Sequence, residues 1–275
     1  MLILRSAAHA VAAFAIVAIA AIGSAAAQQA QTYQPREYQA GKDVVWVPTA
    51  QTLVDRMLDT AKLTPDDYLI DLGSGDGRTV ITAAQRGATA LGVEYNPKMV
   101  ELSKENAAKA GVSNRATFVR ADLFKTDISK ATVITLFLLP EINLKLRPKL
   151  LEMKPGTRIV SNSFDMGDWT ADQTIETVDK CMTYCNAFLW IIPAKVEGTW
   201  HLGNDRLAFK QKFQVFTGTL NSGNVVTPIT KGRLNAEEIA FNAGKTFYKG
   251  RVNGSVMEGT STTDGKEMPW RATKG

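Results

Sequence analysis

The chain has 275 residues, of which 45% are apolar, and this is enough to bury a sizeable core in about two domains. These values exclude a disordered chain and a small scaffold held together by disulfides. Its 32 Lys and Arg residues exceed its 27 Asp and Glu residues, a formal charge of +5 that suits an anionic partner only if the charges gather in one part of the chain.

Residues 1–27 have the pattern of a secretory signal peptide. Arg5 precedes an uncharged apolar stretch from Ala7 to Ile22, and small residues follow as far as Ala27. An uncleaved membrane anchor is the alternative, because the stretch is only slightly shorter than a membrane span of about 20 residues. Both readings predict an exported protein that is periplasmic or anchored facing the periplasm.

Residues 28–43 are polar and rich in Gln, which predicts a linker. A helix is expected next, from the spacing of Leu53, Met57, Leu58 and Ala61. Short apolar strands and helices then alternate, which predicts a parallel sheet with helices on both faces over residues 44–195. The expected strands are 68–71, 90–94, 117–120, 132–138 and 158–162, the expected helices are 78–86, 97–110 and 143–152, and runs 174–179 and 187–192 are expected to form a terminal antiparallel hairpin.

Residues 196–275 have a different pattern. From Phe209 to Val215 apolar and polar side chains alternate with a period of two, which predicts a strand. Similar runs recur at 225–229, 238–241, 247–252 and 255–259. Residues 232–235 and 250–253 resemble each other as Gly-Arg-Leu-Asn and Gly-Arg-Val-Asn. We therefore expect a separate all-β domain, a meander that closes into a barrel or sandwich.

A glycine-rich loop follows the first expected strand. Gly73, Gly75 and Gly77 occupy alternate positions before a helix, so the backbone there can turn tightly and approach a ligand at the helix N-terminus. Such a loop at the carboxyl end of a strand is where open α/β sheets bind nucleotides.

Three acids accompany this loop. Asp71 directly precedes it, where a ligand ammonium group would be favoured. Glu94 ends the second expected strand, at about the offset where a carboxylate accepts both ribose hydroxyls. Asp122 follows the third expected strand and is placed to accept the exocyclic amine of an adenine.

Residues 71–77, 92–97 and 121–123 resemble the three cofactor motifs of class I S-adenosylmethionine-dependent methyltransferases. The resemblance covers about residues 46–193. Within that class, residues 47–49, 71–78 and 139–141 are similar to the lysine methyltransferases of the mitochondrial ATP-synthase c-subunit type and their bacterial relatives. The implied fold class is α/β, a Rossmann-like methyltransferase sheet with a terminal antiparallel hairpin, here followed by the all-β domain.

The resemblance implies S-adenosyl-L-methionine as the cofactor. Asp71 would pair with its amino group, Gly73 and Gly75 would hold its carboxylate, Glu94 its ribose and Asp122 its adenine. The full set of implied cofactor-binding residues is Asp71, Gly73, Ser74, Gly75, Gly77, Glu94, Tyr95, Asn96, Asp122 and Leu123. The alternative is a Rossmann-like domain that binds another nucleotide or no nucleotide.

The acceptor side is expected after the fourth and fifth strands. Its candidate wall residues are Pro140, Glu141, Asp165 and Trp169, each with a competing structural role. For Trp169 that role is a core aromatic. The Asn-Pro-Pro-Tyr type motif of amide and adenine amino methylases is absent from the sequence, which disfavours base methylation. No residue is assigned a catalytic role.

Histidine and cysteine further limit the chemistry. The two histidines, His9 and His201, leave the segment between them without imidazole, which excludes a Ser-His-Asp triad or a His-rich metal site built from it, and no metal site is predicted. Cys181 and Cys185 are either a disulfide closing a small loop in an oxidising compartment or two unpaired thiols.

The location of the charge narrows the expected partners. Residues 28–197 carry 20 basic and 21 acidic side chains, whereas residues 198–275 carry 11 and 6. Nucleic acid is therefore not expected as the methyl acceptor, and a protein lysine or a small envelope molecule is favoured. The β domain is where an anionic envelope surface would bind. The alternative function is a non-catalytic envelope protein with a remnant cofactor fold and a ligand-binding β domain.

Overall fold

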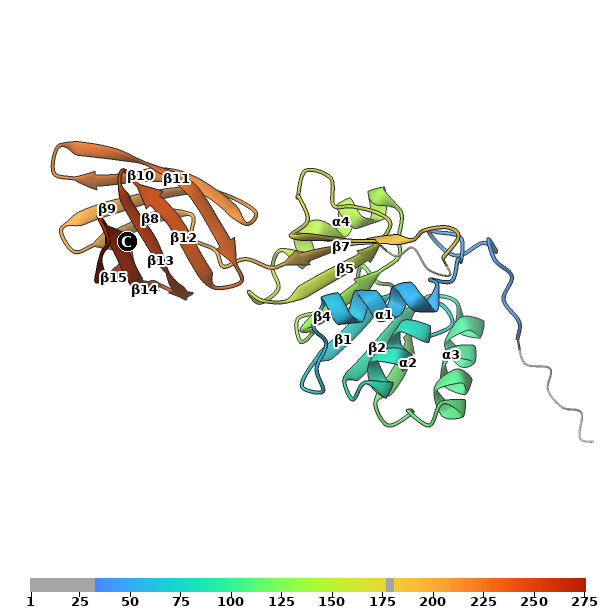
Figure 1. The fold of residues 1–275 in the computed structure, drawn as a ribbon. Helices are drawn as coiled ribbons and strands as arrows, with labels where there is room; N and C mark the ends of the chain where they lie inside the picture. Colours follow the sequence, from blue (N-terminus) through green and yellow to red (C-terminus); the bar gives the residue numbers. More distant parts are fainter. Residues whose placement is uncertain (1–32, 177–180) are drawn as a thin grey trace, which may run out of the picture. The chain divides into compact units, whose positions relative to one another are not determined.

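The computed structural model describes residues 33–176 and 181–275 (Figure 1). The predicted signal peptide, residues 1–27, lies outside the described residues, as do the start of the predicted linker and residues 177–180 of the predicted hairpin. None of the helices in the described part of the chain combines the length and apolar composition that a membrane crossing requires.

Within the described part of residues 51–191, seven strands form one sheet in the order β3-β2-β1-β4-β5-β7-β6. Strands β3, β2, β1, β4 and β5 are parallel, and β7 runs antiparallel to β5 and β6. This confirms the predicted fold. The elements are α1 (Gln51–Thr60), β1 (Tyr68–Leu72), α2 (Arg78–Gln85), β2 (Thr89–Glu94), α3 (Pro97–Lys109), β3 (Ala116–Arg120), β4 (Val133–Leu136), α4 (Pro140–Leu150), β5 (Arg158–Asn162), β6 (Gln173–Glu176) and β7 (Asn186–Ile191).

Both faces of the sheet are apolar, because successive side chains of a strand point to opposite sides. Leu69 and Val133 belong to a buried cluster with residues of α1, α2 and α3. Their neighbours Ile70 and Ile134 belong to a second cluster with residues of α4. The central strands are therefore covered on both faces, as parallel sheets require.

Two element boundaries differ from the predictions in ways that shape the site. β4 ends at Leu136, so Phe137 and Leu138 follow the strand and do not belong to it. α4 begins at Pro140, before the predicted start at residue 143. Proline is well suited to a first helical turn, where its missing N–H has no partner to lose.

The carboxyl ends of four parallel strands meet at one edge of the sheet. β1 pairs with β2 on one side and with β4 on the other, so the direction of strand order reverses between β1 and β4. Open α/β sheets bind ligands in the crevice outside this reversal. The loops that follow β1, β2, β3 and β4 converge there.

Residues 198–274, all described, form eight antiparallel strands that close into a barrel. Its strands are β8 (Gly198–Leu202), β9 (Asp205–Lys212), β10 (Val215–Ser222), β11 (Val225–Asn235), β12 (Glu238–Ala243), β13 (Thr246–Asn253), β14 (Val256–Thr263) and β15 (Lys266–Lys274). β15 pairs with β8 and completes the ring. Ring contacts among Phe209, Phe216, Phe241, Tyr248 and Trp270 fill its interior, which is typical of a small barrel with a solid core.

One predicted barrel strand is wrong. The apolar alternation from Phe209 to Val215 is interrupted by a two-residue turn at Phe213 and Gln214, between β9 and β10. Phe213 has φ of 56°, which is a left-handed conformation. Tight hairpin turns usually have Asn-Gly or Asp-Gly at these positions, so the sequence Phe-Gln does not predict a turn. The side chain of Phe213 stacks on Trp169 of the sheet domain, with 5.6 Å between ring centroids. Tertiary packing therefore replaces the usual Asn-Gly chemistry of a tight hairpin.

Cys181 and Cys185 form a disulfide, with 5.7 Å between their Cα atoms. The bond closes the loop that precedes β7, which settles the alternative that the sequence left open.

Candidate functional site

The glycine-rich loop connects β1 to α2 and lies at the reversal of strand order. Gly75 has φ of 54°, and a Cβ placed on it would lie 2.6 Å from Nε1 of Trp46. The position therefore requires glycine for both its conformation and its space. The backbone N–H of Gly73 donates to the carbonyl of Val93, at 2.8 Å, which holds the loop against β2.

Asp71 is a buried carboxyl at the end of β1. Its Oδ1 accepts a hydrogen bond from Oγ1 of Thr135, on β4, at 2.6 Å. The pKa of Asp71 is raised to about 7: burial raises it most, the Thr135 hydrogen bond lowers it, and the carboxylates of Glu94 and Asp76 add to the rise. A buried acid whose charged neighbours are also acids favours a cationic ligand.

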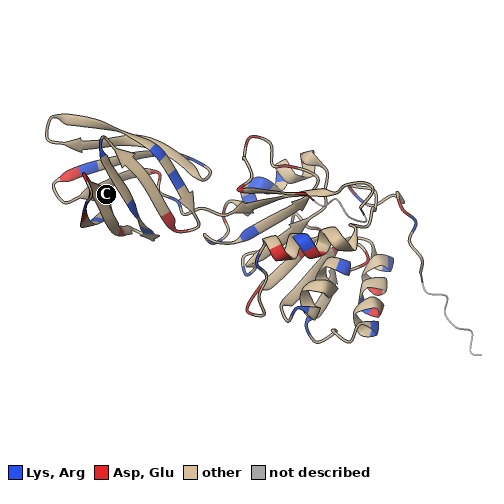
Figure 2. Cartoon of the chain, in the orientation of Figure 1, with Lys and Arg blue, Asp and Glu red and all other residues tan. Residues whose placement is uncertain are grey.

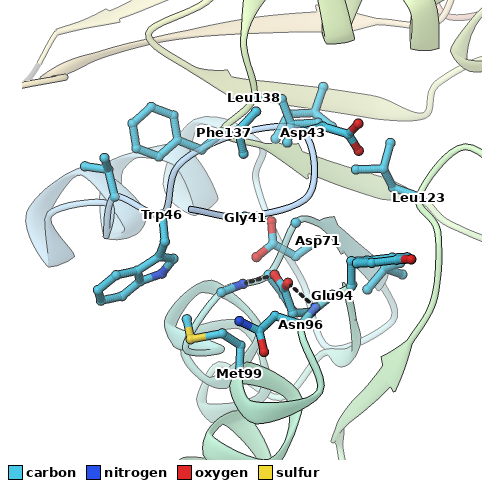
Figure 3. Close-up of a pocket in the computed structure, with 18 of the residues that line it drawn as sticks. Gly41, Asp43, Trp46, Asp71, Glu94, Asn96, Met99, Leu123, Phe137 and Leu138 are labelled. Atoms are coloured by element: carbon cyan, nitrogen blue, oxygen red, sulfur yellow. Dashed lines mark hydrogen bonds between the residues drawn. The ribbon is translucent and has the colours of Figure 1, made fainter. Parts of the chain in front are cut away.

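Glu94 ends β2 and is oriented by two backbone groups, as the dashed lines of Figure 3 show. Its Oε2 accepts from the N–H of Gly75 at 3.1 Å, and its Oε1 accepts from the N–H of Asn96 at 2.8 Å. The Asn96 side chain in turn caps α3 by accepting from the N–H of Lys98 at 3.0 Å. Each carboxylate oxygen keeps a lone pair with which it could accept a ligand hydroxyl.

Asp122 follows β3 and is held from two sides. Oδ1 accepts from the backbone N–H of Phe124, and Oδ2 accepts from Nζ of Lys42, both at 2.9 Å. The Lys42 hydrogen bond, with the Phe124 N–H, lowers the pKa of Asp122. Lys42 also lies 4.9 Å from the centroid of the Tyr95 ring.

Residues 38–49, which we call the strap, lie along the pocket. The strap is a small hairpin in which Ala40 pairs with Val45, and Tyr38 and Trp46 are joined by a backbone hydrogen bond of 2.8 Å. Nη1 of Arg78 donates to the carbonyl of Thr49 at 2.8 Å and fastens its end to α2. Residues 39–43 were predicted as linker. They instead line the pocket, through contacts that a local sequence pattern does not encode.

The strap, the glycine loop and the ends of the strands enclose one pocket. Figure 3 shows Asp71 and Glu94 between Phe137 at one end and Leu123 at the other. Nine of the ten residues predicted to bind the cofactor line it: Asp71, Gly73, Ser74, Gly75, Glu94, Tyr95, Asn96, Asp122 and Leu123. Gly77 instead lies at the start of α2, as its N-cap.

The four predicted acceptor-side residues lie outside this lining. Pro140 and Glu141 form the exposed first turn of α4, and Asp165 is exposed and accepts from the N–H of Gly167 at 3.0 Å. Trp169 is buried in the core, where its Nε1 donates to Gln214. Asp165 and Trp169 therefore have the structural roles that were their alternatives, in a turn and in the core, and the acceptor-side assignment of all four residues stays a prediction.

Sequence reasoning missed the apolar part of the lining. Trp46 and Met99 lie against Gly75 of the glycine loop, and Phe137, Phe164 and Tyr184 also line the pocket. The signal for Trp46 was its place in an apolar run directly before α1. No local pattern distinguishes Tyr184 from an ordinary loop tyrosine.

The pocket also holds a buried hydroxyl without a partner. Oγ of Ser74, in the glycine loop, makes no hydrogen bond within the described residues. Buried polar groups are nearly always paired, so an unpaired hydroxyl in a residue that lines the pocket suits a site for a polar ligand. In residues 33–176 and 181–275, no group of three or more His, Cys, Asp or Glu side chains is placed to hold a metal ion.

Comparison with known proteins identifies the family. Residues 71–173 match the ANTKMT methyltransferase domain. A protein-lysine N-methyltransferase of Saccharolobus islandicus is 43% identical over 152 residues, which cover 54% of this chain and 94% of that protein. The chain belongs to the protein-lysine N-methyltransferase family. This confirms the resemblance found in the sequence.

Two further relatives of this methyltransferase are informative. The human lysine N-methyltransferase of the ATP synthase c-subunit is 39% identical over 118 residues, and the chain covers 51% of its length. A solved structure, described as an RNA methyltransferase from Salinibacter ruber in complex with S-adenosyl-L-homocysteine, is 46% identical. It superposes with a TM-score of 0.51 and covers 55% of this chain and 96% of its own. The barrel lies beyond the residues that match the family.

Proposed function

We propose that this methyltransferase transfers the methyl group of S-adenosylmethionine to the side-chain amine of a protein lysine. The observation that carries the proposal is the lining of one pocket by Asp71, Glu94 and Asp122, three carboxyl groups with different environments. The names of the Saccharolobus and human relatives support lysine as the acceptor.

The three acids fit three groups of the cofactor. The buried Asp71 gains a cationic partner from the amino group of the methionine moiety, which offsets the burial of its charge. Glu94, held by the N–H groups of Gly75 and Asn96, accepts the ribose hydroxyls. Asp122 accepts the adenine amine, either beside Lys42 or in its place.

The bound cofactor supplies an electrophilic methyl group on a sulfonium. The chain's contribution is to hold the acceptor nitrogen in line with that methyl group and to exclude water from the pocket. The acceptor lysine must be deprotonated before it attacks, and an apolar surrounding favours its neutral form.

A protein acceptor suits the charge of the sheet domain better than RNA does. RNA binding depends on phosphate contacts with Lys and Arg side chains. Residues 28–197 carry 20 basic and 21 acidic side chains, and Figure 2 shows the two signs interspersed on α1 and α3. The name given to the Salinibacter protein favours RNA, so RNA belongs in the test as a competing acceptor.

The test combines cofactor binding with methyl transfer. Glu94→Ala and Gly73→Arg are expected to abolish calorimetric binding of S-adenosylmethionine, whereas Glu105→Ala, an exposed acid on α3, should leave it unchanged. Labelled methyl groups are then offered with a lysine-rich protein or with RNA as the acceptor. Label in lysine, located by mass spectrometry, supports the proposal. Label in RNA alone contradicts it. A failure of the wild-type chain to bind the cofactor would favour the alternative of a non-catalytic protein with a remnant cofactor fold.

We further propose that the mature protein acts outside the cytoplasm. The signal-like residues 1–27 and the Cys181–Cys185 disulfide, which suits an oxidising compartment, support this location. A fusion of residues 1–28 to a reporter that is active only in the periplasm tests it. An inactive, cytoplasmic fusion would count against export.

The barrel is proposed as the part that binds an anionic envelope surface. Its residues 198–275 carry 11 basic and 6 acidic side chains. Full-length protein should bind vesicles that contain phosphatidylglycerol at low salt and lose them as salt rises above the physiological range. Equal binding to neutral vesicles would contradict an electrostatic contact.

A further inference from the structure

Three aromatic side chains of the pocket lining lie together. Phe137 follows β4, Phe164 follows β5, and Tyr184 lies in the loop before β7. The centroid of the Phe137 ring lies 5.2 Å from that of Tyr184 and 6.2 Å from that of Phe164, and Phe164 and Tyr184 are 6.1 Å apart. We call these three residues the aromatic cluster.

The aromatic cluster is accessible rather than buried. Tyr184 is 38% exposed, and Phe137 and Phe164 are partly exposed. Figure 3 places Phe137 across the pocket from Leu123, with Asp71 between them. In the proposed function, the part of the pocket with Glu94 and Asp122 holds the ribose and the adenine. The aromatic cluster lies in the part of the pocket that remains for the acceptor.

Tyr184 is held in this wall by covalent and backbone constraints. The Cys181–Cys185 disulfide closes a loop of three intervening residues, and Tyr184 adopts φ of 56° within it. A left-handed conformation is unfavourable for tyrosine, so a surrounding constraint is needed to keep it. The base of the loop is fixed to the end of β5 because the N–H of Ser163 donates to the carbonyl of Asn186 at 2.8 Å.

The chemistry of the aromatic cluster matches a lysine side chain. Aromatic faces pack against the four methylene groups of lysine and attract its ammonium group on approach. The same apolar surface lowers the cost of losing that proton, because burial disfavours the charged amine. An RNA base could also stack on such a surface, which is a further reason to test RNA as a competing acceptor.

We propose that the aromatic cluster is the subsite for the acceptor lysine and that the Cys181–Cys185 disulfide positions Tyr184 within it. The inference rests on the proposed lysine methyltransferase activity. Residues 181–185, which contribute Tyr184 to this subsite, lie beyond residues 71–173, which match the family domain.

The experiment measures acceptor and cofactor parameters separately on the full chain, with poly-L-lysine as the acceptor probe. Tyr184→Ala should raise the KM for poly-L-lysine about tenfold and leave the cofactor Kd within about twofold of wild type, as for loss of one aromatic anchor. Tyr184→Phe should restore the wild-type KM. Met182→Ala is the matched control, because Met182 shares the loop but is 98% exposed and lies outside the pocket lining.

The disulfide is tested in the same assay. The double variant Cys181→Ser with Cys185→Ser should raise the KM as Tyr184→Ala does. Dithiothreitol, which reduces the bond to two thiols, should raise the KM of wild type but not that of the double variant. Melting temperatures near the wild-type value exclude general unfolding as the cause.

The outcomes separate the two proposals. Transfer by wild type with an unchanged KM in Tyr184→Ala overturns the acceptor subsite and leaves the methyltransferase activity standing. A rise in the cofactor Kd of Tyr184→Ala as large as the rise in its KM for poly-L-lysine also overturns the acceptor subsite. Cofactor binding by wild type without any transfer to poly-L-lysine contradicts the proposed acceptor and this inference together.

Discussion

Asp71 and Thr135 are joined across the centre of the sheet, with 2.6 Å between the carboxylate Oδ1 and the hydroxyl Oγ1. They lie in register on the adjacent strands β1 and β4. The Thr135 hydrogen bond lowers the pKa of Asp71, whereas burial and the nearby acids raise it, and the balance leaves it at about 7. The charge of this pocket therefore changes close to neutral pH.

Cofactor affinity should consequently rise with pH through neutrality. Below pH 7 Asp71 takes up a proton and no longer pairs with the ammonium group of the methionine moiety, which stays protonated up to about pH 8. We expect the calorimetric Kd of S-adenosylmethionine to be about tenfold higher at pH 5.5 than at pH 7.5. Thr135→Val should move this transition to higher pH, since it removes the interaction that lowers the pKa. A Kd that is constant from pH 5.5 to 8 would contradict the role of Asp71.

The same carboxyl group should destabilise the protein when no cofactor is bound. Its folded pKa of about 7 exceeds the ordinary value of 3.8, so the ionised form is disfavoured in the fold by up to about 4 kcal/mol. The resulting loss of folding stability is absent below about pH 4, grows as pH rises, and is complete above about pH 7. Asp71→Asn should therefore raise the melting temperature at pH 8, have little effect at pH 4, and abolish cofactor binding. Equal melting temperatures of wild type and Asp71→Asn at pH 8 would argue against a buried, ionised Asp71.

Gly75 and Trp46 should behave as a coupled pair. A Cβ on Gly75 would meet Nε1 of Trp46 at 2.6 Å, so Gly75→Ala displaces the strap and is expected to weaken cofactor binding by about tenfold or more. Trp46→Ala makes space for that Cβ, so the double variant should lose less affinity than the two single effects combined. Gly111→Ala is the matched control, because Gly111 has φ of 70° but no atom within 4 Å of its Cβ position. Additive losses would show that Trp46 does not act through Gly75.

The three acids that line the pocket were predictable because their signals are local. Asp71, Glu94 and Asp122 each lie at or just beyond the carboxyl end of a short apolar strand, and the ends of parallel strands must meet at one edge of a sheet. The glycines of the loop are likewise encoded by the backbone they require. Strand β5 was predicted with its observed bounds, since its apolar run is flanked by Gly156 on one side and a polar loop on the other.

The parts that were missed depend on contacts between distant segments. Residues 38–43 of the strap fall in the predicted polar linker, yet residues 39–43 line the pocket. The turn at Phe213 was predicted as strand, because its contact with Trp169 is not visible in the local sequence. β15 was not expected, because it contains Pro269 and its pairing with β8 spans the whole barrel sequence. Propensity and periodicity describe neighbours along the chain, so they carry no information on such pairs.

The position of Trp169 yields the last prediction. Gln214 is buried and links two groups of the segment that precedes β6: its Oε1 accepts from Nε1 of Trp169 at 2.9 Å, and its Nε2 donates to the carbonyl of Thr170 at 2.7 Å. Gln214→Ala leaves the buried Nε1 of Trp169 without a partner, which costs about 1 to 3 kcal/mol, and also removes the hydrogen bond to the carbonyl of Thr170. The free energy of unfolding should fall by about 2 to 4 kcal/mol in urea titrations, whereas Thr217→Ala, at an exposed position on β10, should change it little.

Trp169→Phe then distinguishes a core residue from a pocket wall. It leaves Oε1 of Gln214 unpaired and should lower the free energy of unfolding by about 1 to 3 kcal/mol. Trp169 does not line the pocket, so the cofactor Kd and the KM for poly-L-lysine should both match wild type. A raised KM with unchanged stability would return Trp169 to the acceptor side, where its sequence position first suggested it.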